Sequence, residues 1–132
     1  MIITRPFAAL VMSHGRTQDT YYIRFNAACG KMFDGARYCF ISRTEDMGYL
    51  IIRVSKTQTT RTKHTSVISR DKSGGTKLAC ARLVNSGFLP ERIFGKRYKV
   101  KKDKDGNLYV CLREPLDDDE QADRREGGAN DR

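Results

Sequence analysis

The sequence has little of what metal-binding and secreted proteins need. It contains no tryptophan, only two histidines, and four cysteines that never form a Cys-x-x-Cys pair. Zinc sites are usually marked by such closely spaced pairs, so a metal centre is not expected. Each cysteine lies among apolar neighbours, which predicts buried, reduced thiols in a cytosolic protein and leaves a disulfide open but not indicated. These cysteines are Cys29, Cys39, Cys80 and Cys111.

Long hydrophobic runs are also missing. A membrane-spanning helix needs about 18 or more apolar residues, whereas the apolar stretch near the N-terminus covers only residues 7–12. That stretch lacks the flanks of a signal peptide, and we expect it to be a first strand. No membrane partner is therefore expected.

Signatures of catalysis are absent as well. There is no P-loop and no Gly-x-Gly-x-x-Gly after an apolar run, and both histidines lie in polar stretches far from any cysteine. Residues 73–77, "SGGTK", lack the Walker spacing, although their backbone N–H groups are suited to holding a phosphate. Glu45 and Asp46 are adjacent in an expected turn, where carboxylates are ordinarily solvated. We expect a non-catalytic protein without a cofactor.

Charge is unevenly distributed along the chain. The net charge is +9, but residues 117–132 carry seven acidic and three basic residues, a net of −4. The first 116 residues therefore carry 22 basic and nine acidic residues, a net of +13. The acidic tail lacks apolar residues other than alanine and is predicted to be disordered. This tail either keeps the protein soluble or lies against the basic body and competes weakly with its ligand.

The most basic segment is residues 53–77, with seven cations against the single acid Asp71. Serine and threonine fill the gaps, and cations with hydroxyls are the groups that bind phosphate oxygens. Arg61, Lys63 and Arg70 are the candidate ligands in this segment. The alternative is a solvated basic surface, and the region itself is predicted to be either a further hairpin or a long loop.

The remaining pattern predicts an α+β fold, with one antiparallel sheet and two short helices in a single domain over residues 1–116. Strands are expected at residues 20–25, 36–42, 48–56, 96–102 and 108–114. Asn26 is an expected N-cap of the first helix, and Thr76 of the second. The Asp105-Gly106 pair is a strong turn signal between the last two strands.

A short motif occurs twice. The sequence Gly-x-Arg-Tyr ends at Tyr38 and again at Tyr98, sixty residues later. Each copy follows an expected helix and begins an expected hairpin, which indicates an approximate repeat of helix plus hairpin. The halves cover about residues 20–56 and 76–114, joined by the basic linker 53–77. Because neither half can cover its own helix, we expect a shared core and self-association.

The stretch "KLACARLVNSGFLPERIFGKRYKV" consists of a helix, a glycine, basic residues and a strand. In this order it resembles the half-unit of swapped-hairpin barrels of the AbrB/SpoVT type. The resemblance implies a DNA- or RNA-binding regulator that uses the basic strands and loops of a dimer.

The chain as a whole also resembles the Thoeris anti-defence sponges of phages and mobile elements. The resemblance depends on size, element order and residues 23–28, "IRFNAA", followed by an apolar strand pair. It implies a symmetric oligomer in the host cytoplasm that sequesters an anionic nucleotide, such as a cyclic ADP-ribose isomer or a cyclic oligonucleotide. It also implies an arginine on the last strand, matched by Arg113, and a base-stacking aromatic, matched by Phe88 or Phe25.

Three functions are therefore expected as alternatives: nucleotide sequestration, nucleic-acid binding, or inhibition of a host defence complex by a protein contact. The candidate ligand-binding residues are Arg24, Phe25, Arg61, Lys63, Arg70, Phe88 and Arg113.

Overall fold

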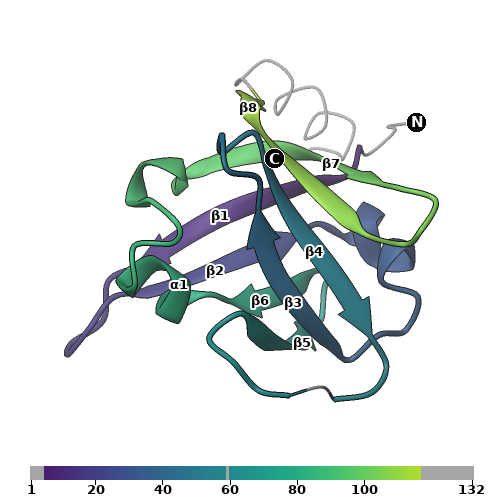
Figure 1. Cartoon of the computed structure of the whole chain (residues 1–132), viewed down its shortest axis with the longest axis horizontal. Helices are drawn as coiled ribbons and strands as arrows, with labels where there is room; N and C mark the ends of the chain where they lie inside the picture. The colour runs from purple at the N-terminus through teal and green to yellow at the C-terminus, as the bar shows by residue number, and fades with distance from the viewer. Residues whose placement is uncertain (1–4, 59, 117–132) are drawn as a thin grey trace.

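The computed structural model describes residues 5–58 and 60–116. Within them, eight antiparallel strands close a barrel in the order β1-β2-β6-β5-β3-β4-β8-β7, with β7 pairing back to β1 (Figure 1). The strands are β1 (Phe7–Ser13), β2 (Thr20–Phe25), β3 (Tyr38–Arg43), β4 (Tyr49–Ser55), β5 (Thr65–Arg70), β6 (Thr76–Ala79), β7 (Lys96–Lys102) and β8 (Leu108–Pro115). The helical elements are the 3-10 helices η1 (Ala27–Phe33) and η2 (Glu91–Ile93) and the α-helix α1 (Ala81–Asn85).

The barrel shows that the predicted α+β class is wrong. The first expected helix is the 3-10 helix η1, and the second begins at Ala81 instead of following Thr76. Residues 76–79 form β6, which pairs with β2 on one side and β5 on the other. Thr76 and Leu78 point into the barrel and are fully buried. As a strand, these residues form backbone hydrogen bonds with both β2 and β5, and this pairing outweighs their local preference for a helix.

The core is the filled interior of the barrel. Alternate residues of each strand point inward, as in Leu50 and Ile52 of β4, which are completely buried. An eight-stranded barrel has an interior just wide enough for side chains to fill it. Phe25 and Phe33 meet edge to face at 5.1 Å and close the end of the barrel near η1.

The strand order contains an internal two-fold pseudosymmetry. If β1, β2, β3 and β4 are exchanged with β5, β6, β7 and β8 respectively, every strand still has the same two neighbours around the barrel. The structural repeat is thus hairpin, helical segment, hairpin. The two motif tyrosines are not equivalent within it: Tyr38 is on the outer face of β3, whereas Tyr98 is 1% exposed and donates a 2.6 Å hydrogen bond to the Ile93 carbonyl. A one-residue offset along a strand moves a side chain to the opposite face.

The connection between β4 and β5 has an unusual path. Both strands pair with β3: Tyr38 lies opposite Ser55 and Val67, and Phe40 lies opposite Arg53 and Thr65. The chain must therefore pass from one side of β3 to the other, and it does so along the lower edge of the molecule in Figure 1. This path places His64, at the end of the β4–β5 connection, against Phe40 on the outer face of β3.

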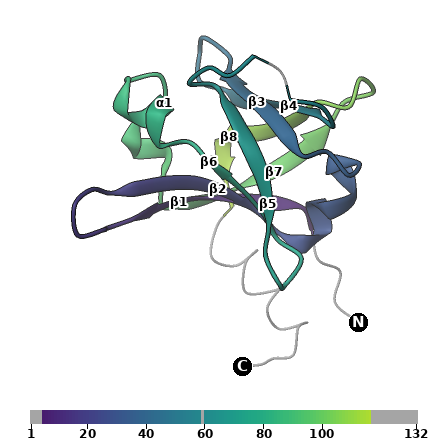
Figure 2. The same cartoon turned by 90° about the horizontal axis from the view of Figure 1, so that it is seen from below.

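Figure 2 shows the β1–β2 hairpin projecting to one side of the barrel, with α1 standing beside it. In the described part of the chain, no helix has the length and apolarity needed to cross a membrane. The predicted acidic tail, residues 117–132, lies outside the described residues.

Candidate phosphate-binding groove

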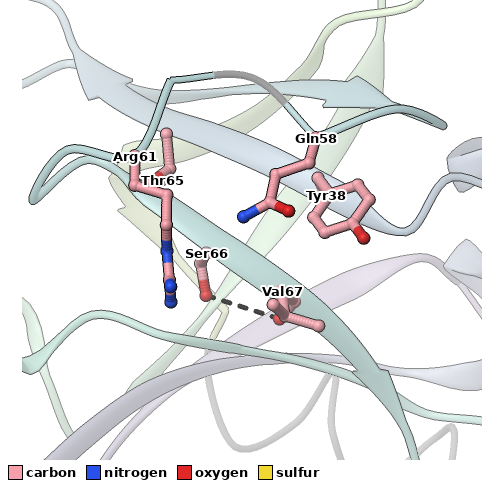
Figure 3. Close-up of a pocket in the computed structure, with 6 residues that line it drawn as sticks. All are labelled: Tyr38, Gln58, Arg61, Thr65, Ser66 and Val67. Carbon is pink, nitrogen blue, oxygen red and sulfur yellow. Dashed lines mark hydrogen bonds between the residues drawn. The ribbon is translucent and has the colours of Figure 1, made fainter.

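Three hollows adjoin on the outer surface around β3 and β5. They measure about 320, 40 and 290 Å³, and the small middle one, shown in Figure 3, shares lining residues with each neighbour. We call these three adjoining hollows together the β3–β5 groove. Its lining residues are Tyr38, Cys39, Phe40, Arg53, Val54, Ser55, Gln58, Arg61, Thr62, Lys63, Thr65, Ser66, Val67, Ala79, Cys80, Ala81 and Arg82.

Four cations line the groove, and none of the lining residues is acidic. Arg53 comes from β4, Arg61 and Lys63 from the β4–β5 connection, and Arg82 from α1. All four are exposed, and among the described residues no hydrogen bond or ion pair engages their side chains. No acidic side chain in the groove lining therefore offsets their positive charge.

Three cations outside the groove form ion pairs within the described residues: Arg24, Lys102 and Arg113. Arg24 Nε donates to Asp71 Oδ2 at 2.9 Å, and Lys102 Nζ lies 2.7 Å from Asp34 Oδ2. The groove lining lacks such acidic partners in part because residues 47–70 contain no aspartate or glutamate.

A hydrogen-bonded turn contains Lys63 and directly follows Arg61. The Thr65 hydroxyl donates to the Thr62 carbonyl at 2.9 Å and accepts from the Thr62 N–H at 3.0 Å. The His64 N–H donates to the Thr62 hydroxyl at 3.1 Å. These local bonds order the end of the connection on either side of Lys63. Figure 3 shows the Arg61 side chain extending from this region toward Ser66.

Aromatic side chains form the floor of the groove beside the cations. Phe40 stacks on His64 with ring centroids 5.1 Å apart and planes at 17°, and it stays 37% exposed. His64 is held by a 2.9 Å contact between its Nδ1 and the Ile41 carbonyl. Tyr38 lines two of the hollows and, within the described residues, has neither a ring partner nor a hydrogen bond at its hydroxyl.

The structure brings only two of the predicted ligand residues into the groove, Arg61 and Lys63. Arg70 lies at the far end of β5, roughly 16 Å from Thr65 at the usual strand rise. Its guanidinium donates to the Ala36 carbonyl at 3.4 Å.

The predicted residues near the N-terminal half lie elsewhere. Arg24 is on the outer face of β2, where Asp71 and the hydroxyl of Ser73 hold its guanidinium. Phe25 is completely buried against Phe33 and has no face available to a ligand.

The remaining predicted residues are engaged by the protein itself. Phe88 lies under the guanidinium of Arg43, 4.4 Å from the ring centroid, and meets His64 edge to face at 4.7 Å. Arg113 forms an ion pair with Asp46 at the β3–β4 turn.

Sequence reasoning missed four groove residues. Arg53 was within the basic segment but was not singled out, and Tyr38 and Phe40 could have been found from strand alternation, since residues two apart share a face. Arg82 had no sequence signal, because it is 21 positions from Arg61 and meets it only through the pairing of β5 with β6.

The two cysteines of the groove are not activated as nucleophiles. Burial raises the pKa of the Cys39 and Cys80 thiols to about 12, so both stay protonated at neutral pH. Among the described residues, no group of three or more histidine, cysteine, aspartate or glutamate side chains is placed to hold a metal ion.

Comparisons with protein families, curated proteins and solved structures find no match to this chain.

Proposed function

We propose that the protein is a non-catalytic nucleic-acid-binding protein that holds a phosphate backbone along the β3–β5 groove. The observation that carries this proposal is the set of four exposed cations without an acidic neighbour in the groove lining. Guanidinium groups and hydroxyls together supply the charge and hydrogen bonds that phosphate oxygens take up.

The spread of the cations favours a polymer over a single nucleotide. Arg53 is on β4, and Arg82 follows β6, which is three strand spacings away, roughly 14 Å around the barrel surface. A site for a small ligand surrounds it and buries most of its surface. All four cations here are exposed along an extended groove, which suits successive phosphates of a chain.

The resemblance of a helix-plus-hairpin stretch to AbrB/SpoVT units favours the same class of ligand, since proteins of that family bind DNA. The barrel itself consists of two interleaved hairpin–helix–hairpin units within one chain. Because both units are present in one chain, the barrel closes without a second copy. The shared core thus needs no second copy, and self-association stays a prediction that follows from the resemblance to the anti-defence sponges alone.

Binding assays with the full chain test the proposal. Fluorescence anisotropy would measure affinity for labelled DNA and RNA, and thermal shift would report binding of cyclic nucleotides and ADP-ribose isomers. We expect polynucleotide binding that the Arg61→Ala/Arg82→Ala double variant weakens at least about tenfold, since charge-assisted contacts contribute about 1.5–3 kcal/mol each.

Arg113→Ala is the matched control, because Arg113 is exposed but lies outside the groove in an ion pair with Asp46. It should leave binding unchanged. A response to small cyclic nucleotides alone would replace the proposal with nucleotide sequestration. No response to any nucleotide or nucleic acid would overturn it in favour of a protein partner.

A further inference from the structure

The floor of the groove has a property that phosphate binding does not use. Among the described residues, the large hydrophobic side chains classed as exposed are Met12, Phe40 and Val67, and the last two belong to this groove. Val67 is 57% exposed and lies opposite Tyr38 in the β3–β5 ladder. Apolar surface left open to water in one place commonly marks a binding surface.

Tyr38 and Phe40 form a platform on β3. They are two residues apart in one strand, so both face outward with their Cα atoms roughly 6.6 Å apart. Cations flank this platform on both sides: Arg53 lies opposite Phe40 on β4, and Arg61 shares the middle hollow with Tyr38. The arrangement is an aromatic floor between two positive edges.

Such a floor matches unpaired bases. Every base has a flat π face that stacks on an aromatic side chain, whereas in a duplex these faces are covered by neighbouring base pairs. The backbone of Arg53 lies about one strand spacing from that of Phe40, so its side chain can reach the backbone of nucleotides stacked on the platform.

We propose that the groove selects single-stranded nucleic acid, with bases stacked on Tyr38 and Phe40 and phosphates held by Arg53 and Arg61. This inference rests on the proposed nucleic-acid binding and specifies its substrate class. It assigns a role to Tyr38, whose ring has no aromatic partner and whose hydroxyl has no hydrogen bond among the described residues.

The test compares a single strand of about 12 nucleotides with a duplex of the same length, a range that covers typical single-strand site sizes. We expect the full chain to prefer the single strand. Tyr38→Ala should weaken single-strand binding about 5- to 150-fold, leave duplex binding unchanged, and leave the salt dependence unchanged because stacking releases no counterions. Tyr38→Phe should restore affinity.

Tyr49→Ala is the matched control. Tyr49 is also a half-buried outward tyrosine, but it lies on β4 in a different hollow with Tyr109 and Lys101. Equal losses from Tyr38→Ala and Tyr49→Ala would overturn the assignment. Equal affinity of the parent for single strand and duplex would also overturn it, while leaving the proposed function in place.

Photochemical cross-linking supplies a measurement that needs no variant. A 5-iodouracil oligonucleotide bound to the parent protein should cross-link to the peptide that contains Tyr38 and Phe40, as identified by mass spectrometry. Cross-links confined to the Tyr49 and Tyr109 hollow would refute the inference. Absence of polynucleotide binding in the same samples would instead refute the proposed function.

Discussion

Removal of one groove cation should change the salt dependence of nucleic-acid binding by a calculable amount. Each phosphate contact releases condensed counterions, so the logarithm of the binding constant falls with the logarithm of salt concentration by about 0.7 per contact for a single strand. The four groove cations, Arg53, Arg61, Lys63 and Arg82, therefore predict a slope of about −2.8.

This slope converts into a measurable loss of affinity. Raising the salt from about 50 to about 200 mM should weaken binding about 50-fold for the parent protein. Arg61→Ala removes one contact, so its slope should be about −2.1 and its loss over the same range about 18-fold. Fluorescence anisotropy titrations over a series of KCl concentrations give both slopes directly.

The fold itself should not respond to this substitution. Arg61 is exposed and its side chain makes no hydrogen bond or ion pair with other described residues, so the melting temperature should stay close to that of the parent. Arg113→Ala should leave the slope near −2.8, because Arg113 lies outside the groove. An Arg61→Ala slope equal to that of the parent, or an equal change for Arg113→Ala, would refute phosphate contact at this position.

Three further predictions concern the fold. A hydrogen bond from Ser73 and the nearby Arg24 guanidinium lower the pKa of Asp71 to about 2, so Asp71→Asn should lower the free energy of unfolding at pH 7. The difference from the parent should vanish as the pH falls from about 4 to about 2, and denaturation curves that differ as much at pH 2 as at pH 7 would contradict this. Leu50→Ala should lower the free energy of unfolding in urea by about 2–5 kcal/mol because Leu50 is fully buried in the barrel, and a loss under about 1 kcal/mol would indicate loose packing there. Cys39 and Cys80, with pKa values raised to about 12 by burial, should react with thiol reagents at pH 8 only after denaturation, and rapid labelling of the native protein would disprove their burial.

Much of the strand pattern could be predicted from the sequence. Alternating apolar residues mark β2, β4 and β7 because a side chain on a strand faces alternately inward and outward, and this local rule does not depend on the partner strand. The Asp105-Gly106 turn is equally local: the Gly106 φ of +90° is a conformation that glycine adopts without strain. The basic character of residues 53–77 is a property of composition alone.

Tertiary structure decided what the local pattern left ambiguous. Residues 76–79 are compatible with a helix or a strand, and they become a strand because β2 and β5 leave a gap that only a paired strand can fill. Closure through β7 and β1 joins residues about 90 positions apart, for which no periodicity gives a signal.

In the candidate site, too, some residues could be predicted from the sequence and others are brought there only by the tertiary structure. The sequence by itself indicated Arg61 and Lys63, because a run of cations without acids is visible in one dimension. Only the barrel places Arg82 and Tyr38 beside them, since these residues come from other elements and meet where the β4–β5 connection crosses β3. The barrel also removes Phe25 from the surface, because its position on β2 points its side chain into the core, where burial of an aromatic ring is most favourable.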